Sequence, residues 1–167
     1  GIQFLHCLQN EVSGGFSTLV DGFAVAEYIK KNNFQAFESL TTTNLRYQFQ
    51  DKDIVLENWG ELIELDKDGD YKQVRYSTRV DYVPPLETEK LKIFYQSRKL
   101  LSELYCSSEF ELRFKLQPGD IMMFDNHRLL HGRTAYDANE GMRHLQGCYL
   151  EFDATDGKLR HLARKFK

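Results

Sequence analysis

The sequence predicts a single mainly β domain with helices, either a β-sandwich or a jelly roll with its helices on one face. Three observations lead to this prediction. The segment EFELRFKL alternates apolar and charged residues, as a strand with one buried face does. The turn DKDG separates two strand-like runs and indicates a hairpin. Two or three other segments carry apolar residues at helical spacing, so helices accompany the sheets.

The composition is that of an ordinary soluble globular domain. The chain has 167 residues, of which 41% are hydrophobic and 28% charged, values ordinary for one globular domain. The net charge is −3, and no basic stripe suggests a nucleic-acid partner. No apolar run approaches the roughly 18 residues that a membrane helix needs, and we expect neither a membrane span nor a signal peptide.

The first third of the chain predicts two strands followed by two helices. Strands over residues 2–8 and 16–22 are expected to pair as a hairpin through the glycine-bearing turn NEVSGG. Asp21 is suited to cap a helix over about 22–31, which has one apolar face. Asn33 then begins a short helix through FQAFESL.

The middle of the chain predicts ragged strands over residues 44–83, with the DKDG hairpin among them. The acidic residues of this turn suggest a calcium-binding loop as one interpretation. Its glycine comes too early for an EF-hand loop and no glutamate closes the loop at the required distance, so we interpret it as a plain turn. Pro84 and Pro85 end the strand pattern, and a long core-packed helix is expected over about 86–105.

The last third predicts three strands and a closing basic helix. EFELRFKL is expected to bury Phe110, Leu112, Phe114 and Leu116, and IMMF to form a short buried strand. HRLLHGR is expected to lead into a loop, and RHLQGCYLEF to form the last strand. The three cysteines lie far apart without a CxxC pair, so we predict reduced, buried thiols and no structural zinc site.

His131 and Arg143 are the residues in this region that suggest chemistry. Imidazole suits iron, zinc or copper, and His131 is expected just after a strand. Arg143 lies twelve residues further on, and across a hairpin the two side chains would face one cavity. An arginine there can hold a carboxylate with two parallel hydrogen bonds. In the strand from Arg143, Gly147 leaves room for a ligand and Tyr149 offers its ring to a cation. Alternatively, these side chains only line a sheet surface.

Here the sequence resembles a known family. PGDIMMFDNHRLLHGR followed by RHLQGCYLEFD resembles the C-terminal half of the iron(II)- and 2-oxoglutarate-dependent dioxygenases, specifically the γ-butyrobetaine hydroxylase and trimethyllysine hydroxylase group. GIQFLHCL, GGFSTLVDGF and KKNNFQAF support the same resemblance, which is closer to γ-butyrobetaine hydroxylase. The resemblance implies a double-stranded β-helix, a cupin-like jelly roll of the taurine-dioxygenase-like type.

The resemblance also implies roles for four residues. His131 falls on the distal histidine that binds Fe(II), and Arg143 on the arginine that pairs with the 2-oxoglutarate carboxylate. Tyr149 falls on a tyrosine of the aromatic cage around the substrate's trimethylammonium group, and Leu5 on a position beside 2-oxoglutarate. His127, where the family usually has a tryptophan, is interpreted as a packing residue. The implied cofactors are Fe(II), 2-oxoglutarate as cosubstrate and ascorbate as reductant.

Two features depart from the family pattern. The His-x-Asp pair that completes the iron site is missing, and His6 cannot supply it because Leu8 stands where the carboxylate belongs. Residues 1–167 are therefore expected to be the C-terminal portion of one catalytic domain, lacking the upstream pair and inactive alone. In VRYSTRVDY, residues such as Arg79 replace an asparagine pair, and Arg79 would repel a cationic substrate unless it points away.

The predicted function is hydroxylation of a small quaternary-ammonium substrate, γ-butyrobetaine to carnitine. The alternatives are a trimethyllysine hydroxylase, a non-catalytic jelly-roll binding module with an incomplete metal site, and a purely structural jelly roll. We expect a small-molecule substrate, no nucleic acid and no membrane, with a homodimer as one possible assembly. The expected location is cytoplasmic, with a mitochondrial one as the alternative.

Overall fold

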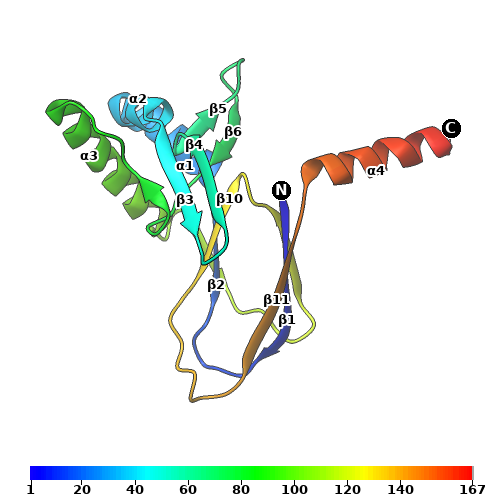
Figure 1. Cartoon of the computed structure of the whole chain (residues 1–167). Coiled ribbons are helices and arrows are strands. Elements are labelled where there is room, and N and C mark those ends of the chain that lie inside the picture. Colours follow the sequence, from blue (N-terminus) through cyan, green and yellow to red (C-terminus); the bar gives the residue numbers. More distant parts are fainter. Residues whose placement is uncertain (167) are drawn as a thin grey trace. The chain divides into compact units, whose positions relative to one another are not determined.

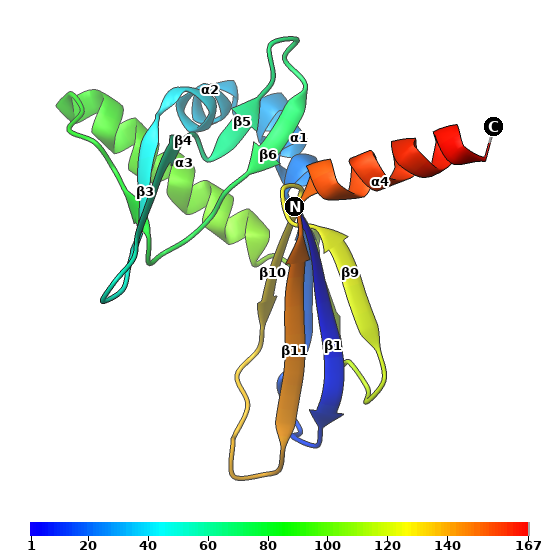
Figure 2. The same ribbon diagram turned by 45° about the vertical axis from the view of Figure 1, so that its right-hand side comes forward.

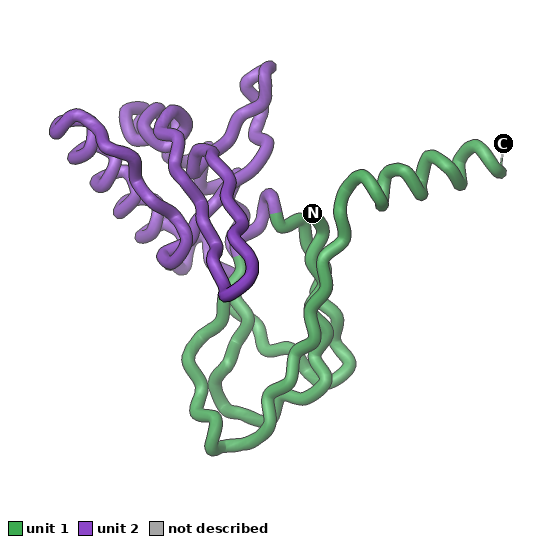
Figure 3. The backbone as a smooth tube through the Cα atoms, in the orientation of Figure 1, with its two compact units in different colours: residues 1–18, 113–126, 131–167 green, residues 19–112, 127–130 purple. Residues whose placement is uncertain are grey.

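A computed structural model describes residues 1–166 of the chain as two compact units (Figure 3). Unit 1 contains Gly1–Thr18, Arg113–Asn126 and the chain from His131 onward, and unit 2 contains Leu19–Leu112 and His127–Leu130. The elements follow in the order β1 (Ile2–Asn10), β2 (Ser17–Asp21), α1 (Gly22–Asn32), α2 (Phe34–Thr42), β3 (Leu45–Gln50), β4 (Val55–Gly60), β5 (Ile63–Leu65), β6 (Tyr71–Val74), β7 (Asp81–Tyr82), α3 (Thr88–Tyr105), β8 (Glu111–Phe114), β9 (Ile121–Asp125), β10 (Leu129–Arg133), β11 (Arg143–Leu150) and α4 (Phe152–Lys165) (Figure 1).

The first two and the last four strands of the chain form two three-stranded sheets. One sheet has the order β11-β1-β9, with β1 antiparallel to both neighbours (Figure 2). The other has the order β10-β2-β8. In chain order, β1 belongs to the first sheet, β2 and β8 to the second, β9 to the first, β10 to the second and β11 to the first. The predicted mainly β class with helices is confirmed.

The predicted hairpin between the first two strands is wrong, because β1 and β2 belong to different sheets. Gly15 adopts a positive φ of 69°, a conformation open to glycine, between the two strands. The backbone of Gly15 donates to the Ala135 carbonyl at 3.2 Å, and Thr134 donates to the Phe16 carbonyl at 2.9 Å. The chain therefore leaves the first sheet at this turn and lies beside the end of β10.

Burial in two strands differs from the prediction. Leu112 of β8, expected on the buried face, is 66% exposed, although Leu116 beyond the strand is buried. In β9, expected to be buried, Met122 and Phe124 are buried while Ile121 and Met123 are each 62% exposed. For β9 the reason is the strand period of two, because a continuous apolar run does not show whether both faces are covered. Of the cysteines, Cys7 is buried as predicted, whereas Cys106 and Cys148 are exposed.

Unit 2 holds the main hydrophobic core. Helix α2 packs against α1 and α3, and α1 and α2 also contact the two-stranded sheet β5-β6. The largest fully buried side chains of this core are Phe94, Ile29, Leu40, Leu45, Leu62, Ile63 and Leu101. Burial of each such side chain contributes about 1.5–3 kcal/mol to folding. This core makes unit 2 a self-contained body.

Local signals in unit 2 are confirmed. The Asn33 side chain accepts from the Ala36 backbone N–H at 3.0 Å and begins α2. The predicted hairpin forms between β5 and β6, where the Asp66 carboxylate accepts from the N–H groups of Asp68 and Asp70 at 2.8 and 3.0 Å. This carboxylate is occupied by its own turn, which agrees with a plain turn rather than a calcium loop.

Asp21 caps α1 as predicted, and its loss is expected to destabilise the fold. Its carboxylate accepts from the N–H of Phe23 at 3.0 Å and also pairs with Arg128 at 2.6 Å. Burial raises the pKa of Asp21, but the bonds from Arg128 and the backbone outweigh burial and hold this pKa below its ordinary value. Asp21→Ala should therefore lower the free energy of unfolding by about 1 kcal/mol at pH 7.

The same pKa gives this prediction a pH dependence. Because the folded-state pKa lies below the unfolded value of about 3.9, the stabilisation is fully present above that pH. It is lost as the pH falls through the folded-state pKa. Urea unfolding of the wild type and of Asp21→Ala from pH 7 downward measures this directly. A difference that stays constant down to the acid limit would contradict the assigned role.

Helix α4 closes the chain, as the sequence predicts. It has no buried residues, and Arg164 and Lys165 lie in its last turn. Within residues 1–166, none of the helices combines the length and apolar character needed to cross a bilayer.

Candidate active site

The inner face of the β11-β1-β9 sheet carries the residues that the sequence singles out. At one end, Gln3 of β1 lies opposite Tyr149 of β11 and Phe124 of β9. In the middle, Leu5 lies opposite Gly147 and Met122. At the other end, Asn10 lies opposite Arg143.

His131 joins the Gln3 end of this face. It lies within β10, not in a loop after a strand as expected. Its Nε2 is 3.5 Å from Nε2 of Gln3, and its ring centroid is 5.0 Å from that of Phe124. Desolvation of the imidazole lowers the pKa of His131. A lowered pKa favours the neutral ring, which is the form that binds metal ions.

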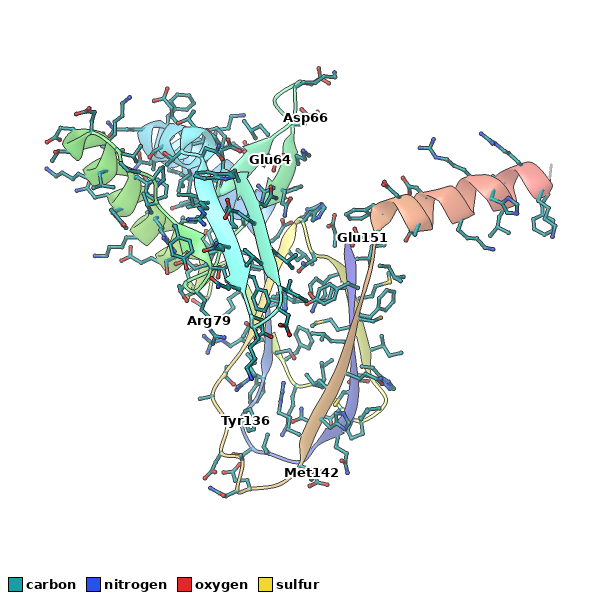
Figure 4. All side chains as sticks on the ribbon, viewed as in Figure 1. Glu64, Asp66, Arg79, Tyr136, Met142 and Glu151 are labelled. Atoms are coloured by element: carbon teal, nitrogen blue, oxygen red, sulfur yellow. The ribbon has the colours of Figure 1, made fainter. Side chains whose placement is uncertain are left out.

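Arg143 lies at the opposite end and does not face His131 across a hairpin. Its strand β11 pairs with β1, whereas β10 belongs to the other sheet, so the predicted hairpin between the two residues is wrong. The guanidinium lies 5.3 Å over the ring of Tyr136, which comes from the loop before β11 (Figure 4). Nη2 is 3.5 Å from the Gly15 carbonyl, and the buried Nε has no hydrogen-bond partner among residues 1–166.

The unpartnered Nε makes Arg143 suited to an anion. A buried donor without a partner costs about 1–3 kcal/mol, and a carboxylate accepting from a guanidinium removes such a cost with a charge-assisted bond. No carboxylate of the described residues pairs with Arg143. The guanidinium is thus suited to bind a carboxylate.

Leu5 and Gly147 form the floor between the two ends. A Cβ on Gly147 would lie 3.2 Å from Cδ2 of Leu5. The Tyr149 side chain is 64% exposed. Tyr149 pairs with Gln3 in the β1–β11 ladder and therefore lies at the His131 end of this sheet face. The structure therefore gathers His131 and Tyr149 around Gln3, with Leu5 between them and Arg143.

A side chain at position 147 is expected to obstruct a ligand lying on this floor. Gly147→Val adds three carbons where a single Cβ is already tight against Leu5. We expect the affinity of the full-length protein for 2-oxoglutarate to fall roughly tenfold, or about 1.4 kcal/mol. Isothermal titration with 2-oxoglutarate measures it. Gly157→Val in the exposed helix α4, where an added Cβ meets nothing within 4 Å, is the control. Unchanged affinity in Gly147→Val would place the ligand elsewhere.

A metal site is incomplete in the described residues. Residues 1–166 contain no group of three histidine, cysteine, aspartate or glutamate side chains able to hold a metal ion. Non-haem iron sites use two histidines and a carboxylate, so His131 alone does not fit a complete iron site.

Sequence reasoning missed Gln3, Asn10 and Tyr136. Gln3 is 3% exposed and contacts His131. Its place on the same face as Leu5 follows from the strand period, which was the available signal. Tyr136 lies in a loop where no periodicity applies. His127 is partly buried in the turn before β10, and its carbonyl accepts from the Val74 N–H at 2.8 Å.

These features define a class: a mainly β protein with two three-stranded sheets whose strands carry an imidazole and a guanidinium suited to a small anion. Residues 1–149 match the taurine catabolism dioxygenase TauD, TfdA family. The chain belongs to this family.

Individual relatives agree with the family. The chain is 38% identical over 172 residues to γ-butyrobetaine dioxygenase of Homo sapiens, covering 99% of this chain and 44% of that protein. It is 30% identical over 166 residues to mitochondrial trimethyllysine dioxygenase of Bos taurus, covering 92% of this chain and 37% of that protein. An asparagine oxygenase crystallised with Fe(II), 3-hydroxyasparagine and succinate has the same fold, with a TM-score of 0.66 at 16% identity over 87% of this chain and 44% of that one. The chain thus spans under half the length of these curated relatives.

Proposed function

We propose that these residues are the C-terminal portion of one catalytic domain of an iron(II)- and 2-oxoglutarate-dependent dioxygenase. In this proposal Arg143 holds the distal carboxylate of 2-oxoglutarate, and His131 is one of the iron ligands. The observation that carries it is the buried, unpartnered Nε of Arg143 on the sheet face that also bears Gln3, the neighbour of His131. The two remaining ligands would come from outside this chain.

The chain's own residues prepare the site for this chemistry. Arg143 binds and orients one end of the cosubstrate, with Leu5 and Gly147 beneath its carbon chain. The buried side chains of Met122 and Phe124 exclude water from the same face. Bound iron would couple oxidation of 2-oxoglutarate to hydroxylation of the substrate. The neutral state of His131 leaves a nitrogen lone pair for that metal.

The proposed substrate is γ-butyrobetaine, converted to carnitine. The 38% identity to the human γ-butyrobetaine dioxygenase supports it over trimethyllysine, whose dioxygenases are 30–32% identical; the γ-butyrobetaine dioxygenase of Pseudomonas is 31% identical. The exposed ring of Tyr149 supplies a face for a trimethylammonium group. Arg79, the residue expected to repel this cation if it faced it, has an exposed side chain (Figure 4).

A second function rests on the incomplete metal site. With one imidazole among the described donors, a non-catalytic module that binds a small dicarboxylate through Arg143 is the alternative. Ascorbate as reductant, a cytoplasmic or mitochondrial location and a homodimer stay predictions.

A turnover assay on the full-length protein separates these functions. Fe(II), ascorbate and 2-oxoglutarate are supplied, and succinate is followed with γ-butyrobetaine, with trimethyllysine or with neither. Stimulation by γ-butyrobetaine supports the proposal, and stimulation by trimethyllysine keeps the chemistry but changes the substrate. No succinate under any condition, with 2-oxoglutarate still bound, would favour the binding module.

A further inference from the structure

Asn10 lies directly opposite Arg143 in the β1–β11 ladder. Directly paired residues of antiparallel strands point to the same face, with Cβ atoms about 4.5–5.5 Å apart. Asn10 is 8% exposed, so its amide lies inside the structure rather than in water. The two side chains therefore share one buried end of the inner face.

The pair carries complementary groups that both lack partners. Oδ1 of Asn10 and Nε of Arg143 are buried, and neither has a hydrogen bond within residues 1–166. Oδ1 is an acceptor, and Nε–H is a donor. Each unmade bond costs free energy when buried, and a single bond between the two would remove both costs.

The orientation of the Asn10 amide is fixed by its other bond. Nδ2 donates to the Leu116 carbonyl at 2.8 Å. A carbonyl only accepts, so the amide nitrogen must face Leu116 and the oxygen must face away from it. The acceptor without a partner is therefore Oδ1, because a flipped amide would lose the bond to Leu116.

A β-bulge brings Asn10 to this face. The register shifts between Cys7 and Gln9, so that Cys7 pairs with Leu145 and Asn10 with Arg143 while Leu8 is left over. In a regular strand Cys7 and Asn10, three residues apart, would point to opposite faces. The extra residue returns Asn10 to the buried side, and re-aiming a side chain beside a functional site is a common use of bulges.

Few other contacts fix the orientation of the Arg143 guanidinium. Tyr136 supports one face of the guanidinium, and the Gly15 carbonyl lies 3.5 Å from Nη2, at the limit of a hydrogen bond. A Cβ on Gly15 would approach Nε to 2.9 Å, so glycine there leaves room for the side chain to turn. A bond at Nε would fix the plane of the guanidinium and direct both Nη atoms at a ligand.

We infer that Asn10 is a positioning residue for Arg143: its Oδ1 accepts from Arg143 Nε when the guanidinium binds a carboxylate of 2-oxoglutarate. This inference rests on the proposed function. The resulting geometry leaves Nη1 and Nη2 for the two carboxylate oxygens, which is the favourable two-point arrangement.

The test uses the full-length protein labelled with ¹⁵N-arginine. The Nε–H resonance of Arg143 is the one missing from the spectrum of Arg143→Lys. Its hydrogen-exchange rate and the Kd for 2-oxoglutarate are measured without turnover. We expect the ligand to slow exchange at this N–H at least tenfold in the wild type. Asn10→Leu should remove most of this slowing and raise Kd roughly tenfold.

Two further variants separate positioning from a structural effect. Asn10→Asp loses the bond to Leu116 but keeps an acceptor for Nε, so it should restore slow exchange. Gln9→Leu, at the exposed neighbouring position, should match the wild type. Wild-type exchange and Kd in Asn10→Leu would overturn the inference. An Arg143 resonance that does not respond to 2-oxoglutarate in the wild type would instead overturn the proposed function.

Discussion

Replacing His131 with alanine in the full-length protein is expected to abolish iron binding and to reduce substrate-stimulated succinate formation by at least about a thousandfold. One of three protein ligands would be lost, and the remaining two hold iron poorly. Stability should change little, because the His131 side chain contacts mainly Gln3 and the Phe124 ring. Iron content by metal analysis and succinate by mass spectrometry give the two readouts.

His127→Ala is the matched control for this variant. It removes a histidine four residues earlier, and alanine keeps the backbone carbonyl that accepts from Val74. Iron content and turnover should both stay near wild type. If His131→Ala kept its iron while His127→Ala lost it, the iron ligand would be His127 and the assignment to His131 would be wrong.

Replacing Arg143 with lysine is expected to raise the KM for 2-oxoglutarate about 10–100-fold while iron binding is retained. Lysine keeps the positive charge but cannot present two parallel N–H donors to a carboxylate. Hydrogen bonds to charged groups contribute about 1.5–3 kcal/mol, which corresponds to this range. At saturating 2-oxoglutarate, kcat should fall less than kcat/KM, because the lost contact is to the cosubstrate's distal end.

Arg133→Lys provides the comparison for Arg143→Lys. Arg133 also lies over the Tyr136 ring, with 4.6 Å between its guanidinium carbon and the ring centroid, but it is exposed. Its replacement should change the KM for 2-oxoglutarate by less than about threefold. Equal effects of the two variants would show that the contact with the Tyr136 ring, and not the two parallel N–H donors of Arg143, determines the KM for 2-oxoglutarate.

Local features of this fold could be predicted from the sequence because they depend on neighbouring residues. Asp21 and Asn33 begin their helices through bonds to backbone N–H groups two or three residues ahead. The Asp66 turn likewise closes through its own backbone. Such caps and turns need no information from distant parts of the chain.

Strand pairing could not be predicted in the same way. A glycine-bearing turn such as the one at Gly15 is compatible with a hairpin and with a crossing between two sheets. Here the crossing is stabilised by hydrogen bonds to Thr134 and Ala135, which lie more than 100 residues away in the sequence. This also explains why His131 and Arg143, close in sequence, lie in different sheets.

Which candidate residues share a sheet face could be predicted from the sequence, whereas the pairing of the strands could not. Strand parity and the family resemblance lead to Leu5, Gly147 and Tyr149, and the structure places them on one face with Arg143. Asn10 could not be found by parity, because the bulge at Leu8 reverses the alternation. A single extra residue in one strand is not visible in a periodicity argument.

The most direct test of the proposed site is a crystal structure of the full-length protein with Mn(II) and 2-oxoglutarate, with the metal located by its anomalous scattering. We expect the metal to be bonded to an imidazole nitrogen of His131 and a 2-oxoglutarate carboxylate to be held by Arg143, with the cosubstrate lying over Leu5 and Gly147. A metal bound away from His131, or a cosubstrate that does not touch Arg143, would contradict it.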